Sequence, residues 1–113
     1  MRTVLAHCMI LTAGVANAQS LGADTLGDGP CAQFAQQFKQ NPSSERIWYI
    51  WAKGFMSGVN SATSKTYRDL AAMSEDNQLA YLRSYCDQHP LGDYRDAVAS
   101  LFTRLPERAR PKE

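Results

Sequence analysis

The sequence lacks an excess of charge of either sign, since 12 basic residues stand against 11 acidic ones, for a formal net charge of +1. This balance excludes a polybasic nucleic-acid binder and an acidic tail protein. The chain also lacks length: its 113 residues make one small domain, which is too short for a Rossmann or barrel fold. A hydrophobic share of 44% and a charged share of 20% are ordinary for a globular protein and exclude a low-complexity chain.

Residues that carry chemistry are few. The chain has three cysteines and two histidines, and no glycine-rich loop that could hold a phosphate. Cys86 and His89 supply two metal ligands, but no second Cys/His pair completes a tetrahedral site. His89 precedes Pro90 at the expected end of a helix, where an imidazole more often interacts with the helix terminus than catalyses. The sequence therefore predicts no enzyme, no metal site and no cofactor.

Residues 1–18 have the pattern of a cleaved export signal. Arg2 forms a short positive region, Val4 to Val15 are mostly apolar, and Ala16-Asn17-Ala18 places small residues where a signal peptidase reads them. The apolar stretch is shorter than the about 20 residues that a bilayer span needs. We expect cleavage after Ala18, export to the periplasm and no membrane span in the mature chain.

Removal of this signal leaves two cysteines, Cys31 and Cys86. An exported protein with one cysteine pair is expected to form one disulfide bond. A loop of this length would stabilise the domain by ~4 kcal/mol in the chain-entropy description, which is large beside the ~5–10 kcal/mol available to a small domain. The competing interpretations are a catalytic thiol, which the pairing would consume, and a metal site.

Two helices are predicted in the first half of the mature chain. After a small and polar segment, 19–29, expected to be flexible, apolar residues recur three and four positions apart over 31–40, before Asn41-Pro42. Ser43 or Ser44 can cap a second helix of about 18 residues. A continuous apolar and small stripe follows this second helix, and its members are Ile47, Ile50, Trp51, Gly54, Phe55, Gly58, Val59 and Ala62.

Small residues recur every four positions in that stripe, at Gly54, Gly58 and Ala62. Glycine in a helix interior costs ~1 kcal/mol relative to alanine, and the close approach of another helix is the expected compensation. We predict close packing of these three residues against another helix of the same domain, and a dimer seam is the alternative.

Aromatic residues cluster on the same helix. Trp51 and Phe55 lie on the stripe and are predicted to be core residues. Trp48 and Tyr49 lie off its centre, so they are expected either to form a partly exposed contact surface or to pack under the segment 63–73.

Two further helices are predicted in the second half. Ser74 is expected to cap one, with acidic residues in its first turn, and His89-Pro90 to end it. Another begins around Gly92-Asp93 and ends at Leu105-Pro106. The segment between the second and third helices is less regular, with a short helix expected around 67–72.

The C-terminal tail, 106–113, is charged and proline-bearing and is predicted to be disordered. No alternation of apolar and polar residues runs over a useful length, so no strand is predicted. The expected fold is therefore all-α: a small four-helix domain over 30–105, closed by one long-range disulfide.

Charge offers one physical hint about function. After signal removal 11 basic residues balance 11 acidic ones. Because carboxylates are protonated well below pH ~4, the mature chain would carry roughly +13 at pH ~2. Such a charge strains a fold of this size and can break an interface that is stable at neutral pH.

The two cysteine contexts and the tryptophan helix together resemble a known family. Cys31-x-x-Phe34 opens a helix, WYIWAKGFMSG follows at 48–58, and YLRSYCDQHP follows at 81–90. With the signal and the single long-range disulfide, this pattern resembles the HdeA/HdeB family of periplasmic acid-stress chaperones. The resemblance implies an all-α, disulfide-bonded homodimer that dissociates in acid and exposes apolar surface to unfolding clients. It implies a Cys31–Cys86 pair and a client-binding surface formed by Ile47, Trp48, Ile50, Trp51, Phe55 and Val59.

A second class of protein also resembles this chain. Tai-type immunity proteins, which neutralise secreted amidases in the periplasm, are small, exported and helical, with a Trp/Gly-x-x-x-Gly helix and a late YL…HP element. Here that element carries Cys86 inside it, which favours the chaperone family. A structural envelope protein with no enzymatic role is a third interpretation. The predicted partners are therefore unfolded periplasmic proteins or one specific protein, and no nucleic acid.

Overall fold

The computed structural model describes Gly27 and residues 29–112, so the predicted export signal and its cleavage site lie outside the described residues. As predicted, these described residues form a mostly helical fold, with the four helices α2 (Cys31–Gln40), α3 (Glu45–Ser61), α4 (Glu75–Gln88) and α5 (Tyr94–Arg104). Two 3-10 turns, Pro42–Ser44 and Leu70–Ala72, and two short strands, β1 (Thr66–Arg68) and β2 (Glu107–Ala109), complete the described chain.

Local signals set most helix boundaries. The Ser74 hydroxyl accepts a hydrogen bond from the Asn77 N–H at 3.2 Å and caps α4, as predicted. The same helix ends before His89-Pro90, because a residue that precedes proline avoids helical geometry. The cap before α3 differs from the prediction. Asn41 accepts from the Ser43 N–H at 3.3 Å and starts a 3-10 turn that leads into the helix, so neither serine is the side-chain cap.

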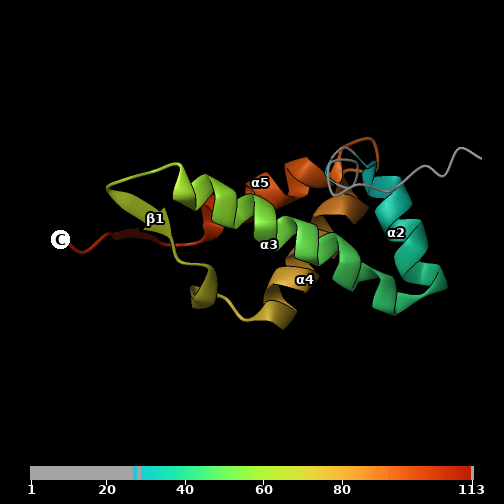
Figure 1. The fold of residues 1–113 in the computed structure, drawn as a ribbon. Coiled ribbons are helices and arrows are strands. Elements are labelled where there is room, and N and C mark those ends of the chain that lie inside the picture. Colours follow the sequence, from blue (N-terminus) through green and yellow to red (C-terminus); the bar gives the residue numbers. More distant parts are fainter. Residues whose placement is uncertain (1–26, 28, 113) are drawn as a thin grey trace, which may run out of the picture.

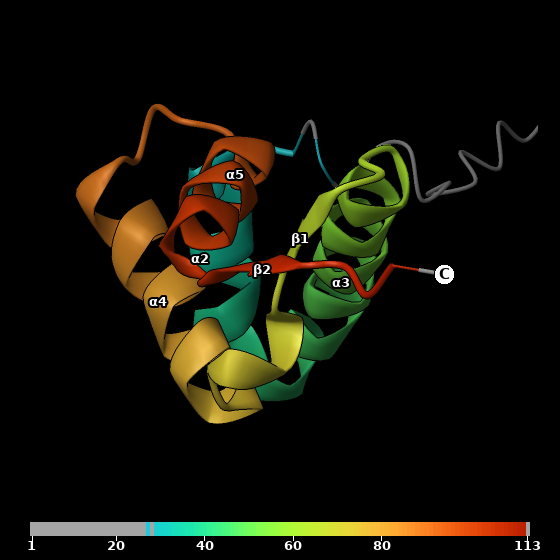
Figure 2. The ribbon, with the colours of Figure 1, turned by 90° about the vertical axis from the view of Figure 1, so that its left-hand side faces the viewer.

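Helix α3 runs along the length of the molecule, with α2 at one end and the β1–β2 pair at the other (Figure 1). Helices α4 and α5 pack against each other, and α2 packs on α4. Seen from the strand end, α5 lies between α3 and α4 (Figure 2). No helix within the described residues is long and apolar enough to cross a membrane.

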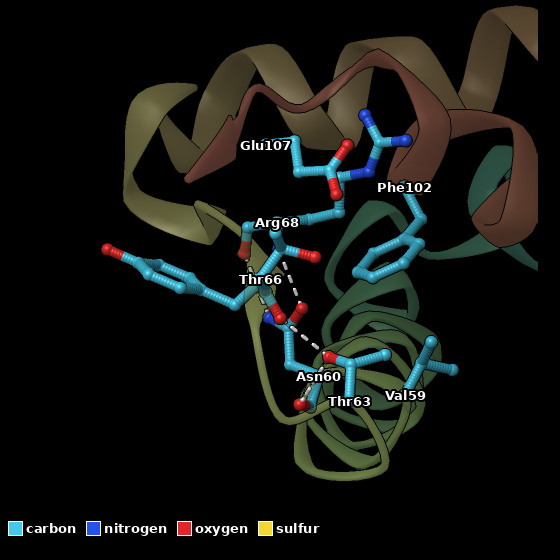
Figure 3. Close-up of a pocket in the computed structure, with 8 residues that line it drawn as sticks. Val59, Asn60, Thr63, Thr66, Arg68, Phe102 and Glu107 are labelled. Atoms are coloured by element: carbon cyan, nitrogen blue, oxygen red, sulfur yellow. Dashed lines mark hydrogen bonds between the residues drawn. The ribbon is translucent and has the colours of Figure 1, made fainter. Parts of the chain in front are cut away.

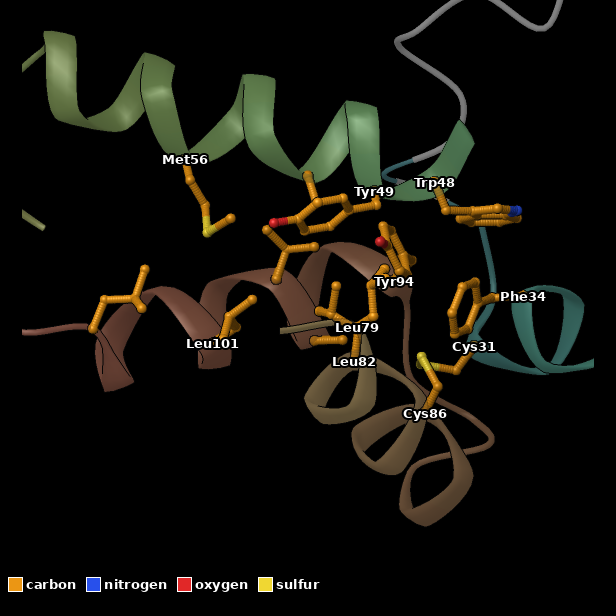
Figure 4. Close-up of a cluster of buried hydrophobic side chains, with 14 residues drawn as sticks. Cys31, Phe34, Trp48, Tyr49, Met56, Leu79, Leu82, Cys86, Tyr94 and Leu101 are labelled. Atoms are coloured by element: carbon orange, nitrogen blue, oxygen red, sulfur yellow. A yellow bond between two sulfur atoms is a disulfide. The ribbon is translucent and has the colours of Figure 1, made fainter. Parts of the chain in front are cut away.

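The core contains residues from all four helices (Figure 4). It includes a group of three rings from α2, α3 and α5, in which the Phe34, Trp48 and Tyr94 centroids lie 4.9–5.5 Å apart. Beside these rings the predicted disulfide is present: Cys31 on α2 and Cys86 on α4 are both buried and bonded, with their Cα atoms 4.8 Å apart. The bond and the rings thus join α2, α3, α4 and α5 at one end of the molecule.

The rotation of α3 differs from the prediction. Trp48 and Tyr49 are buried, whereas Ile47 and Ile50 are 61% and 65% exposed. The buried side of α3 also includes Ala52 and Met56, and two long-range hydrogen bonds satisfy the polar ends of the buried rings. The Trp48 indole N–H donates to the Gln37 side chain at 2.8 Å, and the Tyr49 hydroxyl donates to Gln78 Oε1 at 2.9 Å. Because apolar or small residues cover much of this helix, hydrophobicity alone does not fix which side faces the core.

The predicted close packing of Gly54, Gly58 and Ala62 within the domain is wrong. A Cβ built at Gly54 or Gly58 meets no atom of the described residues within 4 Å, and Ala62 is exposed. The small residues lie on the outward side because the buried side is occupied by Trp48 and its neighbours. The dimer-seam alternative stays a prediction.

Two short antiparallel strands, referred to below as the hairpin although α4 and α5 lie between them in the sequence, replace part of the predicted irregular segment and disordered tail. Strand β1 pairs antiparallel with β2, with Tyr67 opposite Arg108, so no part of 107–109 is disordered. The strands are three residues long, too short for an alternating pattern to reveal them. A side chain of α3 holds the first strand: Asn60 accepts from the Arg68 N–H at 2.7 Å and donates to the Arg68 carbonyl at 2.8 Å. An amide on α3 thereby occupies the outer edge of β1.

Candidate protein-binding face of α3

The outward side of α3 carries Ile47 and Ile50, the large apolar side chains that are exposed on the helices of the described residues. We define the α3 outer face as Ile47, Ile50, Gly54 and Gly58, which recur three and four residues apart and are all exposed. Ile47 and Ile50 expose apolar side chains on neighbouring turns, and Gly54 and Gly58 follow them with no side chain. Together they form a flat strip that is mostly apolar. A strip of this kind suits contact with another protein surface.

The edge of this face is formed by stacked rings. Trp51 and Phe55 lie one turn apart, with centroids 5.3 Å apart and planes at 19°, and both are half-buried. The Trp51 ring lies directly against Gly27, where a Cβ would overlap its atoms. Gly27 is held there because its carbonyl accepts from the Arg95 N–H at 2.9 Å. Trp51 is therefore covered on this side by Gly27 rather than free for a partner.

The six residues predicted to bind clients are thus divided among three environments. Ile47 and Ile50 are exposed on the α3 outer face, and Trp48 is in the core. The remaining three, Trp51, Phe55 and Val59, are half-buried along the edge. Only the first two are available to a partner in the folded protein.

Ion pairs tie the first turn of α3 to α4. Glu45 Oε2 accepts from Arg83 Nη1 at 2.6 Å, and both side chains are mostly shielded, at 13% and 32% exposure. The same guanidinium lies 5.0 Å from the centre of the Phe38 ring, so it also contacts α2. Arg46 and Glu75 form a weaker pair at 3.9 Å.

Buried tyrosines lie next to these carboxylates. Burial raises the pKa of Tyr94 well above its usual value, and the negative charge of Glu45 raises it further. Burial also raises the pKa of Tyr49, with a smaller contribution from Glu75. The Tyr94 hydroxyl has no hydrogen-bond partner among the described residues. The phenols therefore stay protonated in the folded state, and no acid-side titration arises from them.

The hollow at the C-terminal end of α3 is small, and its polar groups already form hydrogen bonds within the protein (Figure 3). It measures about 210 Å³ and is lined by Val59, Asn60, Phe102 and the hairpin. Its polar groups hold the hairpin: Asn60 pairs with the backbone of Arg68, and Arg68 Nη1 donates to the Leu105 carbonyl at 2.9 Å. Thr63 Oγ1 donates to the Thr66 carbonyl at 2.7 Å. These contacts leave the hollow with a structural role.

His89 behaves as predicted for a residue at a helix end. Its Nδ1 lies 2.9 Å from the Tyr85 carbonyl, and its ring stacks on the Tyr85 ring at 4.1 Å. Among residues 27 and 29–112, no group of three or more His, Cys, Asp or Glu residues is placed to hold a metal ion.

Comparison with known proteins gives no match at any level. No protein-family model, no curated protein and no solved structure matches this chain. The resemblance to the HdeA/HdeB family therefore depends on the motifs around the two cysteines and on the tryptophan helix.

Some residues important to the candidate site have no signal in the sequence. Arg83 and Glu45 are 38 residues apart, and Tyr49 and Gln78 are 29 apart, so no local spacing links them.

Proposed function

We propose that the protein is an exported acid-stress chaperone of the HdeA/HdeB kind, which holds unfolding clients on apolar surface of α3. The observation that carries the proposal is the Glu45–Arg83 contact at 2.6 Å, which joins the start of α3 to α4 through a shielded carboxylate. Protonation of that carboxylate leaves Arg83 without its charged partner, so acid weakens the attachment of α3 at the turn that precedes Trp48 and Tyr49.

The disulfide supports the same proposal. Cys31–Cys86 keeps α2 and α4 joined when the ion pairs are lost, so α3 can loosen while the chain stays compact. Ile47 and Ile50 would then form one surface with the aromatic residues newly uncovered beside them. The bond also indicates an oxidising compartment, which supports the periplasm as the location.

The test is light scattering from an aggregating client enzyme moved from neutral pH to pH ~2, with and without the protein. We expect suppression of aggregation in acid and not at neutral pH. Ile47→Ser/Ile50→Ser should weaken suppression without lowering the stability of the folded state, because both side chains are exposed. Suppression that is equal at both pH values, or absent, would contradict the proposal.

A matched pair of variants tests the ionic switch. Glu45→Gln removes the ionised carboxylate at all pH values, so activation should begin at a higher pH than in the wild type. Glu107→Gln is the control, because Glu107 is exposed on β2 and forms no ion pair among the described residues. Identical activation curves for the two variants would exclude Glu45 as the switch.

One observation favours a second candidate, an immunity or inhibitor protein that binds a secreted amidase. Ile47 and Ile50 are exposed on a disulfide-tied scaffold that is already folded, which suits a rigid surface for one partner. This candidate predicts inhibition of an exported amidase at neutral pH, and loss of that inhibition in Ile50→Asp.

A further inference from the structure

Charges in the described chain are segregated along its length. We define the basic end as residues 62–72 and 103–112, which contain six cations and two carboxylates; with Glu113, which follows in the sequence, the net charge of this end is +3. The rest of residues 29–112 has five cations and six carboxylates, for a net charge of −1. The cations of the basic end are Lys65, Arg68, Arg104, Arg108, Arg110 and Lys112.

The hairpin gathers these two segments, distant in the sequence, into one surface at the end of the molecule away from α2 (Figure 1). Three of its arginines hold the hairpin together. Arg68 donates to the end of α5, Arg108 pairs with Asp69 at 3.3 Å, and Arg110 donates to the Asn60 carbonyl at the end of α3. Lys65, Arg104 and Lys112 form no ion pair with any described residue, so their charge is directed to solvent.

The composition of the basic end indicates the kind of partner it can bind. The large exposed apolar side chains of the described chain are Ile47, Ile50 and Leu91, and none belongs to the basic end. A protein interface usually needs such an anchor at its centre. An anionic lipid surface needs only positive charge on mobile side chains. Lys65 and Lys112 lie on the rim of an open hollow of about 820 Å³, wide enough for headgroups to approach both.

We propose that the basic end docks on anionic phospholipid headgroups. Ile47 and Ile50 lie near the start of α3, at the opposite end of the helix from the hairpin (Figure 1). The proposal goes beyond the chaperone function and shares with it only the exported location, which supplies the membrane. The attachment is reversible and sensitive to salt, because it depends on charge alone.

The experiment is sedimentation of the oxidised protein, expressed with its own export signal, with vesicles of phosphatidylglycerol and phosphatidylcholine at neutral pH. Phosphatidylcholine vesicles alone are the lipid control. We expect binding to the anionic vesicles at low salt and release at high salt. Lys65→Glu/Lys112→Glu should lower partitioning at least about 25-fold, since each cation at an anionic surface contributes about fivefold.

The matched control is Lys39→Glu/Lys53→Glu, which changes the net charge by the same amount on exposed lysines outside the basic end. It should retain most of the binding. An equal loss in both variants would show attraction to overall charge and overturn the proposal, as would equal binding to phosphatidylcholine. Absence of vesicle binding together with Lys65-dependent binding to polyglutamate would also overturn it and indicate an acidic protein partner. None of these results depends on the acid chaperone assay, so each proposal can fail alone.

Discussion

The two ends of α3 are held by different interactions. Near its start, Trp48 packs against Phe34 and Tyr94 beside a disulfide, and little of this contact depends on charge. At its other end, the Asn60 side chain and the Arg110 guanidinium bond the hairpin through polar groups that are partly open to water. The aromatic end should therefore resist changes of salt and pH, and the hairpin end should respond to them. Glu45 is the exception, since it brings one carboxylate to the aromatic end.

The largest expected effect is loss of the disulfide at the aromatic end. Cys31→Ser/Cys86→Ser should lower the free energy of unfolding by about 4 kcal/mol, because the unfolded chain regains the freedom of a 55-residue loop. Urea denaturation of the oxidised wild type and the variant measures the difference. Equal midpoints would mean that the bond does not stabilise the fold.

Asn60→Ala tests whether the hairpin end of α3 can be weakened independently of the aromatic end. This change removes two hydrogen bonds to the Arg68 backbone and should cost about 2 kcal/mol. Hydrogen exchange at the Arg68 amide should accelerate while exchange in the aromatic end stays slow. Ser57→Ala, an exposed change on the same helix, is the control. Uniform acceleration throughout the molecule would show that the two ends unfold as one unit.

Alkaline pH is expected to weaken the aromatic end. The pKa of Tyr94 is raised by burial, so the folded state keeps a proton that the unfolded chain releases above pH ~10. Its contribution to stability is complete below that pH and is lost as the pH rises, by about 1.4 kcal/mol for each unit. Tyr94→Phe should be at least as stable as the wild type at neutral pH, because the hydroxyl it removes has no partner among the described residues. The variant should also lose less stability at pH ~11. Urea denaturation at neutral pH and at pH ~11 measures the free energy of unfolding of both proteins. If the wild type and Tyr94→Phe lose equal stability between the two pH values, Tyr94 is not the group responsible.

The smallest expected effects come from two glycines with opposite surroundings. Gly58→Ala meets open space on α3 and should raise the free energy of unfolding by about 1 kcal/mol, the usual gain in a helix interior. Gly27→Ala should destabilise by about 1 kcal/mol or more, because its Cβ overlaps the Trp51 ring. Thermal unfolding of both variants shows whether each change raises or lowers the stability relative to the wild type. A lower stability of Gly58→Ala would indicate that this face is covered by another chain.

Much of the fold could be predicted because its signals are local. Ser74 and Pro90 mark the two ends of α4 within a few residues of chain, and the export pattern leaves only Cys31 and Cys86 to pair. The rotation of α3 could not be predicted in this way. It depends on hydrogen bonds to Gln37 and Gln78, polar residues whose positions are known only after the helices have packed.

The same limit applies to the site and to the hairpin. Exposure of Ile47 and Ile50 follows from the rotation of α3, so it could not be read from the apolar stripe. The hairpin forms because α3 and α5 end near each other and Asn60 meets the backbone of Arg68 there. Three-residue strands have too few side chains to show an alternating pattern.

The disulfide also divides the chain into a covalent ring and a free arm. Residues 31–86 form the ring, which contains α2, α3 and β1, while α5 and β2 follow it on the arm. A single protease cut in the exposed loop at 62–65 opens the ring but leaves every fragment bonded to the rest. A cut in the turn at 90–92 instead releases the arm, and with it the helix that supplies Tyr94, Val98 and Leu101 to the core. Equal nicking at these two sites would thus have unequal consequences, because only the cut before α5 separates a core helix covalently from the rest of the domain.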